Sequence, residues 1–174
     1  RSTLFPYTTL FRSLFIPPGE QEVVVQAVLS DPLVVLARSD HPLAGEKNIA
    51  FARLANEPFL MREPGSGTRM ATLKLFEQHG LAPKMRMELS TNEAIGEAIL
   101  AGLGVSILSR CGLGMELEHT KLACLDVEGF PLERCWHFVY PVGKQLSVAA
   151  HAFMDFARIE AKSLVRDGFA RRPG

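Results

Sequence analysis

Two short polar stretches are the residues best suited to binding chemistry, because each lies between a predicted strand and a predicted helix. They are Ser66-Gly67-Thr68, which precedes a helix at about 69–79, and Ser90-Thr91-Asn92. The start of a helix presents unpaired backbone N–H groups and the positive end of the helix dipole, so both positions favour an anion. Arg69 and Arg110 could add charge, since guanidinium pairs well with carboxylate or phosphate. A second interpretation stays open, in which the hydroxyl side chains are only N-caps.

The stretch from Leu89 to Arg110 organises the rest of the chain. Ser90 and Glu93 have the spacing of a capping box, so a helix is expected to begin there. Its apolar face repeats at helical spacing, and glycines should end it before a strand at 105–108: Ala94, Ile95, Ala98, Ile99, Gly102, Gly104. With a strand at 85–89 before it, this makes a strand–helix–strand unit. In parallel α/β sheets, small ligands bind where such a helix begins.

Patterns of catalytic and metal-binding residues are absent from the sequence. Gly65-Ser66-Gly67 lacks the flanking residues of a nucleophile elbow, and Gly102-Leu103-Gly104 lacks the third glycine of a dinucleotide-binding loop, where Ile107 stands. The five histidines show no metal-ligand spacing. His151 and Asp155 lie one helical turn apart, which is more typical of a surface pair than of a catalytic dyad. We therefore predict no catalytic residue, no metal site and no cofactor.

Composition is that of an ordinary globular protein. The 174 residues are 47% hydrophobic and 22% charged, and Lys+Arg and Asp+Glu both number 19. Zero net charge argues against this chain gripping a nucleic-acid backbone, which requires a concentrated positive face. No apolar run approaches the roughly 20 residues that span a bilayer. Cys111, Cys124 and Cys135 form no CxxC pair, so reduced and mostly buried thiols in a cytoplasmic protein are expected.

Strand-like and helix-like segments alternate along the chain, which predicts an α/β fold with parallel strands. The helix at 69–79 should turn Met70, Leu73 and Phe76 inward. A last helix, capped by Ser147, should bury Ala150, Phe153, Met154 and Phe156. The predicted strands are Val23–Leu29, Leu33–Ala37, Phe59–Met61, Leu122–Val127 and Trp136–Tyr140. Two strands precede the central unit and a strand and helix follow it, as in a chain that leaves one lobe, builds a second and returns.

Residues 1–13, RSTLFPYTTLFRS, do not fit this pattern. They contain no initiator methionine, and Pro6, Thr8 and Thr9 interrupt their apolar residues, so they do not form a signal peptide. They look like translated cloning or adapter sequence joined to a truncated reading frame. We exclude them from the fold prediction and expect the chain to be a fragment.

Four motifs in order resemble the effector-binding domain of LysR-type transcriptional regulators. They are DPLVVLARSDHPLAG, LANEPFLMREPGSGTR, STNEAIGEAILAGLGVSILSR and a closing LSVAAHAFMDF helix. Among these regulators, EPGSGTR, MELSTNEAI and LDVEGFP are most similar to those of Calvin-cycle (RuBisCO) operons. The resemblance covers about 14–161.

The resemblance implies a two-lobed fold like that of type II periplasmic binding proteins, with the effector in the cleft between the lobes. On that pattern residues 14–57 are a partial first lobe, 58–132 the second lobe, 133–162 the return to the first, and 163–174 a polar tail. The implied ligand contacts are Ser90, Thr91 and Asn92, with Ser66, Gly67, Thr68 and Ile107 to Ser109 as further candidates.

Compared with the family, the chain lacks the N-terminal DNA-binding domain, its linker helix and half of the first lobe. We therefore expect that this fragment does not bind DNA itself. Apolar edges such as Val23 to Val25 should be exposed, which favours poor solubility or association.

The predicted function is effector sensing for a transcription regulator that is a cytoplasmic homodimer or homotetramer. The effector would be a small anionic metabolite, such as a phosphorylated sugar or an organic acid. One alternative is a solute-binding receptor of a transport system, which has the same fold but needs a secretory signal. Another is an enzyme of the same two-lobed class, such as porphobilinogen deaminase, which needs a cofactor-bearing cysteine. Only Cys111 lies near a suitable position and nothing around it supports that role, so no enzyme is predicted.

Overall fold

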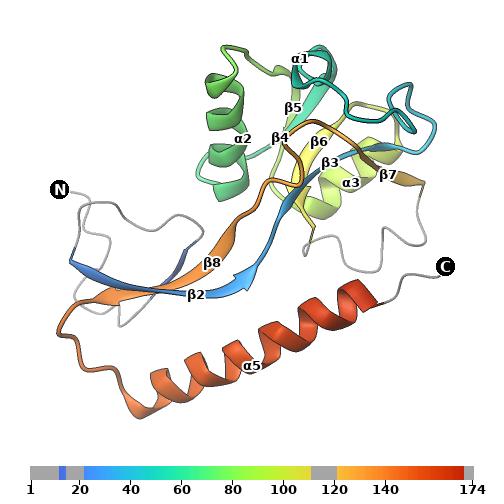
Figure 1. Cartoon of the computed structure of the whole chain (residues 1–174). Coiled ribbons are helices and arrows are strands. Elements are labelled where there is room, and N and C mark those ends of the chain that lie inside the picture. Colours follow the sequence, from blue (N-terminus) through green and yellow to red (C-terminus); the bar gives the residue numbers. More distant parts are fainter. Residues whose placement is uncertain (1–11, 15–21, 111–120, 171–174) are drawn as a thin grey trace. The chain divides into compact units, whose positions relative to one another are not determined.

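The computed structural model describes residues 12–14, 22–110 and 121–170, and the side chains of 22–110 and 121–160 among them. The chain forms two compact units (Figure 1). One comprises Pro32–Glu133, and the other comprises the described residues of Arg1–Asp31 and Arg134–Gly174. The larger unit begins at Pro32, earlier than the second lobe predicted at 58–132, and the lobe boundaries stay a prediction.

The described strands of the larger unit form a three-stranded and a two-stranded sheet that a parallel bridge connects, and one of these strands is reversed. Strand β4 (Pro58–Arg62) pairs in parallel with β5 (Lys84–Leu89), and a parallel bridge between Phe59 and Val105 joins β4 to β6 (Ser106–Ser109). Strand β3 (Leu33–Arg38) lies antiparallel to β6 and to β7 (Leu122–Leu125). The predicted strand–helix–strand unit is thus confirmed, with β4 between its two strands, whereas β3 departs from the parallel pattern.

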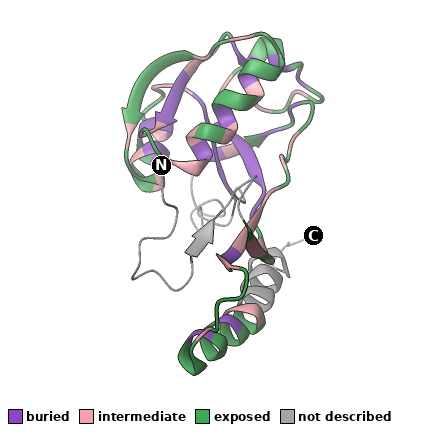
Figure 2. Ribbon diagram, turned by 90° about the vertical axis from the view of Figure 1, so that its left-hand side faces the viewer, coloured by how far each residue is buried: buried purple, intermediate pink, exposed green. Residues whose placement is uncertain are grey.

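Helices cover both faces of this sheet. Strand β4 contacts the helices on each face, because its successive side chains point to opposite faces. Phe59 packs with Phe76 of α2 (Gly67–Gln78) at a ring-centroid distance of 5.1 Å. Phe51 of the short α1 (Phe51–Leu54) lies 4.9 Å from Phe76 on the same face. Leu60 instead joins a cluster with residues of α3 (Asn92–Leu100) on the opposite face (Figure 1). The buried residues of β3, β4 and β6 form much of the core of this unit and are purple in Figure 2, whereas β5 is largely exposed.

The inner face of α2 differs from the one expected. Phe76 is buried, but Met70 is 50% and Leu73 40% exposed. The buried stripe consists of Thr68, Thr72 and Phe76, which recur every four residues. Thr72 Oγ1 donates to the carbonyl oxygen of Thr68 at 2.9 Å, so the hydroxyl is satisfied inside the helix and the threonine can face the core. Sequence hydrophobicity therefore misassigned the face.

Helix α3 begins one residue later than the predicted capping box. Its N-cap is Thr91, whose Oγ1 accepts a hydrogen bond from the Ala94 amide at 3.1 Å, so a cap at Ser90 is wrong. At the other end, Gly102 has φ +74 and donates to the Ile99 carbonyl, while Leu103 donates to the Ala98 carbonyl. This pair of bonds is a Schellman motif and confirms Gly102 as the residue that ends the helix.

Gly104 has a different role from the one expected of a helix stop. Its φ is +154, and a Cβ there would lie 2.2 Å from the carbonyl oxygen of Pro58. The next residue, Val105, donates its amide to that same carbonyl at 2.9 Å. Only glycine lets the backbone come this close to β4, which sets the parallel alignment of β4 and β6.

The smaller unit contains an antiparallel sheet in the order β1-β8-β2. Its strands are β2 (Val23–Ser30), β8 (Cys135–Pro141) and the short β1 (Arg12–Leu14). The predictions for β2 and β8 are confirmed. Arg12 and Ser13, which the sequence analysis excluded as leader, pair with Val139 and Phe138.

Helix α5 (Val148–Ala170) packs against β2 with only part of its predicted apolar face. Ser147 Oγ accepts from the Ala150 amide at 3.1 Å, which confirms the predicted cap. Ala150 and Met154 are buried, whereas Phe153 is 50% and Phe156 61% exposed. The helix continues through most of the segment predicted as a polar tail.

The chain leaves and re-enters the smaller unit at two residues that are bound to each other. Arg134 Nη2 donates to Asp31 Oδ2 at 2.8 Å, and the Asp31 amide donates to the Arg134 carbonyl at 2.8 Å. The side chains are 10% and 2% exposed. Both residues belong to the smaller unit, where the pair joins the end of β2 to the start of β8.

Two further predictions concern the cysteines and the membrane. Cys124 and Cys135 carry free thiols, but Cys124 is exposed, so the expectation of mostly buried thiols is wrong there. Cys111 lies outside the described residues. Among the helices in the described part of the chain, none has the length and apolar character needed to cross a membrane.

Replacing Gly104 with alanine should destabilise the larger unit. The new Cβ would meet the Pro58 carbonyl, and strain of about 1–2 kcal/mol from the backbone conformation would add to about 1–3 kcal/mol of overpacking. Urea denaturation should show a loss of roughly 3 kcal/mol. Gly80→Ala is the matched control, since Gly80 has φ +65 but open space around it. Equal losses for the two variants would contradict the close-approach role.

Removing the two hydroxyls at the start of α3 should affect stability unequally. Thr91→Ala should cost about 1 kcal/mol, because it removes the acceptor of the Ala94 amide, and Ser90→Ala should cost little. Thermal unfolding of both variants beside the unaltered chain measures the difference. A larger loss for Ser90→Ala would return the cap to the position predicted from sequence.

Candidate functional site

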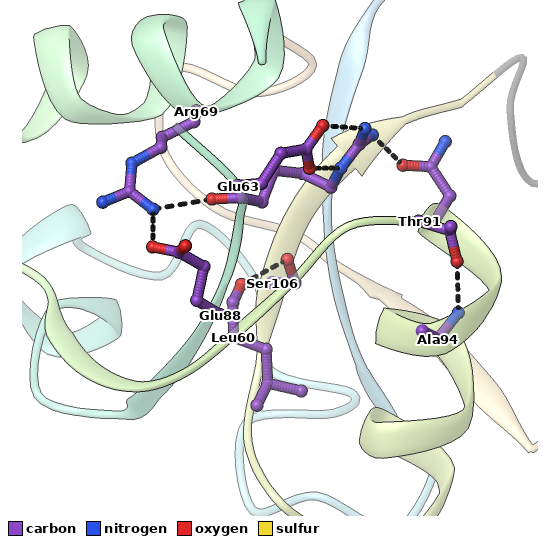
Figure 3. A network of polar contacts seen from close by, with 9 residues as sticks. Leu60, Glu63, Arg69, Glu88, Thr91, Ala94 and Ser106 are labelled. Atoms are coloured by element: carbon purple, nitrogen blue, oxygen red, sulfur yellow. Dashed lines mark hydrogen bonds and ion pairs between the residues drawn. The ribbon is translucent and has the colours of Figure 1, made fainter. Parts of the chain in front are cut away.

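Both polar stretches lie at one edge of the sheet because β4, β5 and β6 are parallel. Their carboxyl ends, Arg62, Leu89 and Ser109, therefore share an edge. Helix α2 follows β4 and helix α3 follows β5, so both helices begin at this edge. The sequence order of strand, polar loop and helix is what places the two loops side by side (Figure 3).

The start of α3 presents donors that have no acceptor. Ser90 and Thr91 are exposed and Asn92 is half-buried. Thr91 uses its hydroxyl and its carbonyl inside the helix, on the amides of Ala94 and Ile95. Within the described part of the chain, the amides of Asn92 and Glu93 have no hydrogen-bond acceptor. These two amides can donate hydrogen bonds to an oxygen of an anion.

The start of α2 is similar, but its N-cap hydroxyl is not used. Ser66 is the N-cap residue, and its side chain makes no cap hydrogen bond. Its amide donates to the Glu63 carbonyl at 3.2 Å and closes a turn in which Gly65 has φ +91. Thr68 is buried and its carbonyl accepts from Thr72. The side chain of Thr91 therefore caps its helix and that of Ser66 does not, and the ligand contacts of both residues stay a prediction.

Arg62 connects the two loops and was missed by sequence reasoning. Its Nε and Nη2 donate to Glu63 Oε2 and Oε1 at 2.7 and 2.9 Å, and its Nη1 donates to Asn92 Oδ1 at 2.7 Å (Figure 3). The side chain is 19% exposed. The sequence signal that could have revealed it is its position, because an arginine there ends a strand directly before a predicted ligand-binding loop.

The charge of Arg69 is already used within the unit. Its Nη1 donates to Glu88 Oε2 at 2.5 Å and to the Arg62 carbonyl at 2.7 Å, so it joins the first turn of α2 to β5 and β4. Its role as an anion partner stays a prediction.

The carboxyl group of Glu63 is held in its charged form by Arg62. Hydrogen bonds from Arg62 lower the pKa of that carboxyl below its ordinary value of 4.5.

The candidates at the end of β6 are not equivalent. Ile107 is 3% exposed and packs in the core, so its side chain points away from solvent, and its ligand contact stays a prediction. Ser109 is 8% exposed at the carboxyl end of β6. Arg110 is exposed, and its amide donates to the Pro32 carbonyl at 2.9 Å.

His151 and Asp155, the one pair considered from the sequence, each contact another residue of the described chain. His151 Nδ1 lies 3.2 Å from the Ser147 carbonyl oxygen, and Asp155 accepts from Arg158, so these two residues do not pair with each other. Groups of three or more His, Cys, Asp and Glu side chains that could hold a metal are absent from the same part of the chain.

Comparison with known proteins agrees with this fold. Residues 14–162 match the family model of the LysR substrate binding domain. The chain is 52% identical over 140 residues to a RuBisCO operon transcriptional regulator of Acidithiobacillus ferrooxidans, covering 80% of this chain and 45% of that protein. It is 47% identical over 152 residues to the HTH-type transcriptional activator CmpR of Synechocystis, covering 86% and 50%. The chain thus spans about half the length of these relatives.

Solved structures show the same fold. The regulatory domain of Synechocystis CcmR in complex with 2-PG has a TM-score of 0.80 and 43% identity, over 87% of this chain and 73% of that one. The regulatory domain of MetR from N. meningitidis has a TM-score of 0.75 at 16% identity, over 94% and 72%, which shows the fold alone. These are the two-lobed α/β regulatory domains that the sequence predicted. The chain belongs to the LysR substrate-binding domain family and is an effector domain of the type found in LysR regulators.

Proposed function

We propose that this chain binds a small anionic metabolite at the edge formed by β4, β5 and β6. The observation that supports the proposal most is the convergence of two helix starts on that edge. The amides of Asn92 and Glu93 lack acceptors in the described structure, and the Ser66 hydroxyl is not used as a cap. Arg62 contributes a guanidinium between the two loops. Helix starts and guanidinium groups both favour anions.

The chemical class of the effector is a phosphorylated or carboxylated small molecule. The CcmR domain, 43% identical to this chain, was solved in complex with 2-PG, which supports a small anion here as well. Ser90, Thr91 and Asn92 would bind the anionic group from α3, and Ser66, Gly67 and Thr68 from α2. The position of the ligand in a cleft between two lobes stays a prediction.

In the intact protein this domain would control transcription. The relatives are named as transcriptional regulators, which favours this role over a transport receptor or an enzyme. DNA binding would belong to a separate N-terminal domain, and the regulator would work as a homodimer or homotetramer in the cytoplasm. The effector would act by binding one arrangement of the regulator more tightly than another, which shifts the population between them.

Thermal melting with and without anions tests the proposed site. At a concentration of 100 times its Kd, a ligand of the folded state adds about 2.7 kcal/mol of stability. We expect 2-PG to raise the Tm of this chain, and of a version extended upstream to the length of these relatives' regulatory domains, more than an uncharged polyol does. Ser90→Ala should reduce the shift by about half or more.

Ser39→Ala is the matched control for this experiment. Ser39 is an exposed serine that follows β3, and β3 runs antiparallel, so Ser39 lies at the opposite edge of the sheet. Its replacement should leave the ligand-induced shift unchanged. The proposal fails if no anion raises the Tm of either version, or if the Ser39 and Ser90 variants respond alike.

A further inference from the structure

We infer that Glu63 is an internal competitor for the anion. Its carboxylate occupies the Arg62 guanidinium that a phosphate or carboxylate group of the effector would take, and binding exchanges one anion for the other. The inference rests on the proposed function, since it concerns how the same edge selects its ligand. No covalent step is involved.

Arg62 is oriented for this exchange by contacts other than the one with Glu63. Its carbonyl oxygen accepts from Arg69 Nη1 at 2.7 Å, which fixes the end of β4 against α2. Its own Nη1 donates to Asn92 Oδ1 at 2.7 Å, which holds the guanidinium against the start of α3. With the guanidinium placed in this way, Nε and Nη2 remain as a two-pronged fork.

The fork holds an anion in the geometry that an effector would use. Nε and Nη2 bind the two oxygens of Glu63 at 2.7 and 2.9 Å, which is the bidentate arrangement that arginine adopts with carboxylate and phosphate. Successive residues of a strand point to opposite faces, so a pair between residues 62 and 63 requires the chain to turn at Glu63. The turn therefore brings an acidic side chain onto the strand-end arginine.

Glu63 can leave the fork without moving its backbone. Its carbonyl accepts from the Ser66 amide, and Gly65 at φ +91 completes that turn, so the backbone is fixed independently of the side chain. The side chain is 36% exposed, and Arg62 is its one side-chain partner among the described residues. Rotation of the side chain into solvent would release the fork.

Arg69 is the second arginine near this pair, and it has an acidic partner of its own. Arg69 of α2 is paired with Glu88 of β5 at 2.5 Å. The Arg62–Glu63 ion pair is partly exposed, and such pairs are weak, so a ligand that also contacts the helix starts can displace Glu63. A doubly charged group competes better than a single carboxylate, because its attraction to the guanidinium is larger. The pair thus favours dianionic groups and lowers the apparent affinity for every anion.

Calorimetric titration of the chain with inorganic sulfate and with 2-PG tests the inference. Glu63→Gln removes the competitor and keeps the side-chain length, and we expect it to lower the Kd of both anions about two- to five-fold. Glu97→Gln is the control, because it removes one negative charge from the exposed face of α3, beyond the first turn of the helix and away from the fork. It should change the Kd less than Glu63→Gln does.

The Glu63 carboxyl carbon gives a second readout that a purely structural role would not change. Its pKa lies below 4.5 while Arg62 holds it. Sulfate stays doubly charged between pH 3 and 7. At saturation it should raise that pKa in a 13C NMR titration, because sulfate then occupies Nε and Nη2 of Arg62 in place of Glu63. Arg62→Lys, which cannot form the fork, should weaken sulfate binding and abolish this shift.

The outcomes separate this inference from the proposed function. Wild-type binding with an unchanged Kd in Glu63→Gln, or an equal gain in Glu97→Gln, overturns the competition and leaves the anion site standing. A Glu63 pKa that does not respond to bound sulfate overturns it too. If neither anion binds the wild-type chain, the proposed function fails and the inference fails with it.

Discussion

The parallel alignment of β4, β5 and β6 is the constraint on which the rest of the larger unit depends. Between β4 and β6 it is set where the backbone at Gly104 approaches the Pro58 carbonyl and Val105 bonds to β4, and between β4 and β5 by their parallel pairing. Because the three strands run the same way, their ends meet at one edge, and the helices after β4 and β5 must begin there. Reversal of β4 or of β5 would separate the two polar loops. Phe59, Phe76 and Leu60 then hold the helices against the two faces of the sheet.

Two arginines at this edge have different roles. Arg69 donates hydrogen bonds to Glu88 and to the Arg62 carbonyl, so it stabilises the loop after β4. Arg62 carries its charge between the helix starts, where it is balanced by an adjacent carboxylate that an incoming anion can replace. The amides of Asn92 and Glu93, which have no acceptor in the described part of the chain, add hydrogen-bond donors that do not depend on pH. The edge is therefore prepared for an anion while its arginine charge stays neutralised in the absence of one.

The sequence predicted the order of elements, the strand–helix–strand unit and the two loops, since these follow from local periodicity and turn chemistry. It did not predict which hydroxyl caps α3, because Ser90 and Thr91 are equally capable and tertiary packing decides between them. The exposure of Met70 and the burial of Thr72 depend on the register of α2 against Phe59, which hydrophobicity does not encode. Arg62 was missed because its neighbours come from three separate segments.

The central claim is that an anion binds where these helices begin, and backbone amide NMR during a 2-PG titration tests it most directly. The account predicts the largest shifts at the amides of Gly67, Asn92 and Glu93, because these donors would point at the ligand. Residues at the opposite edge of the sheet, such as Ser39, should not respond. Saturable shifts confined to that opposite edge, with Asn92 and Glu93 unchanged, would contradict the account.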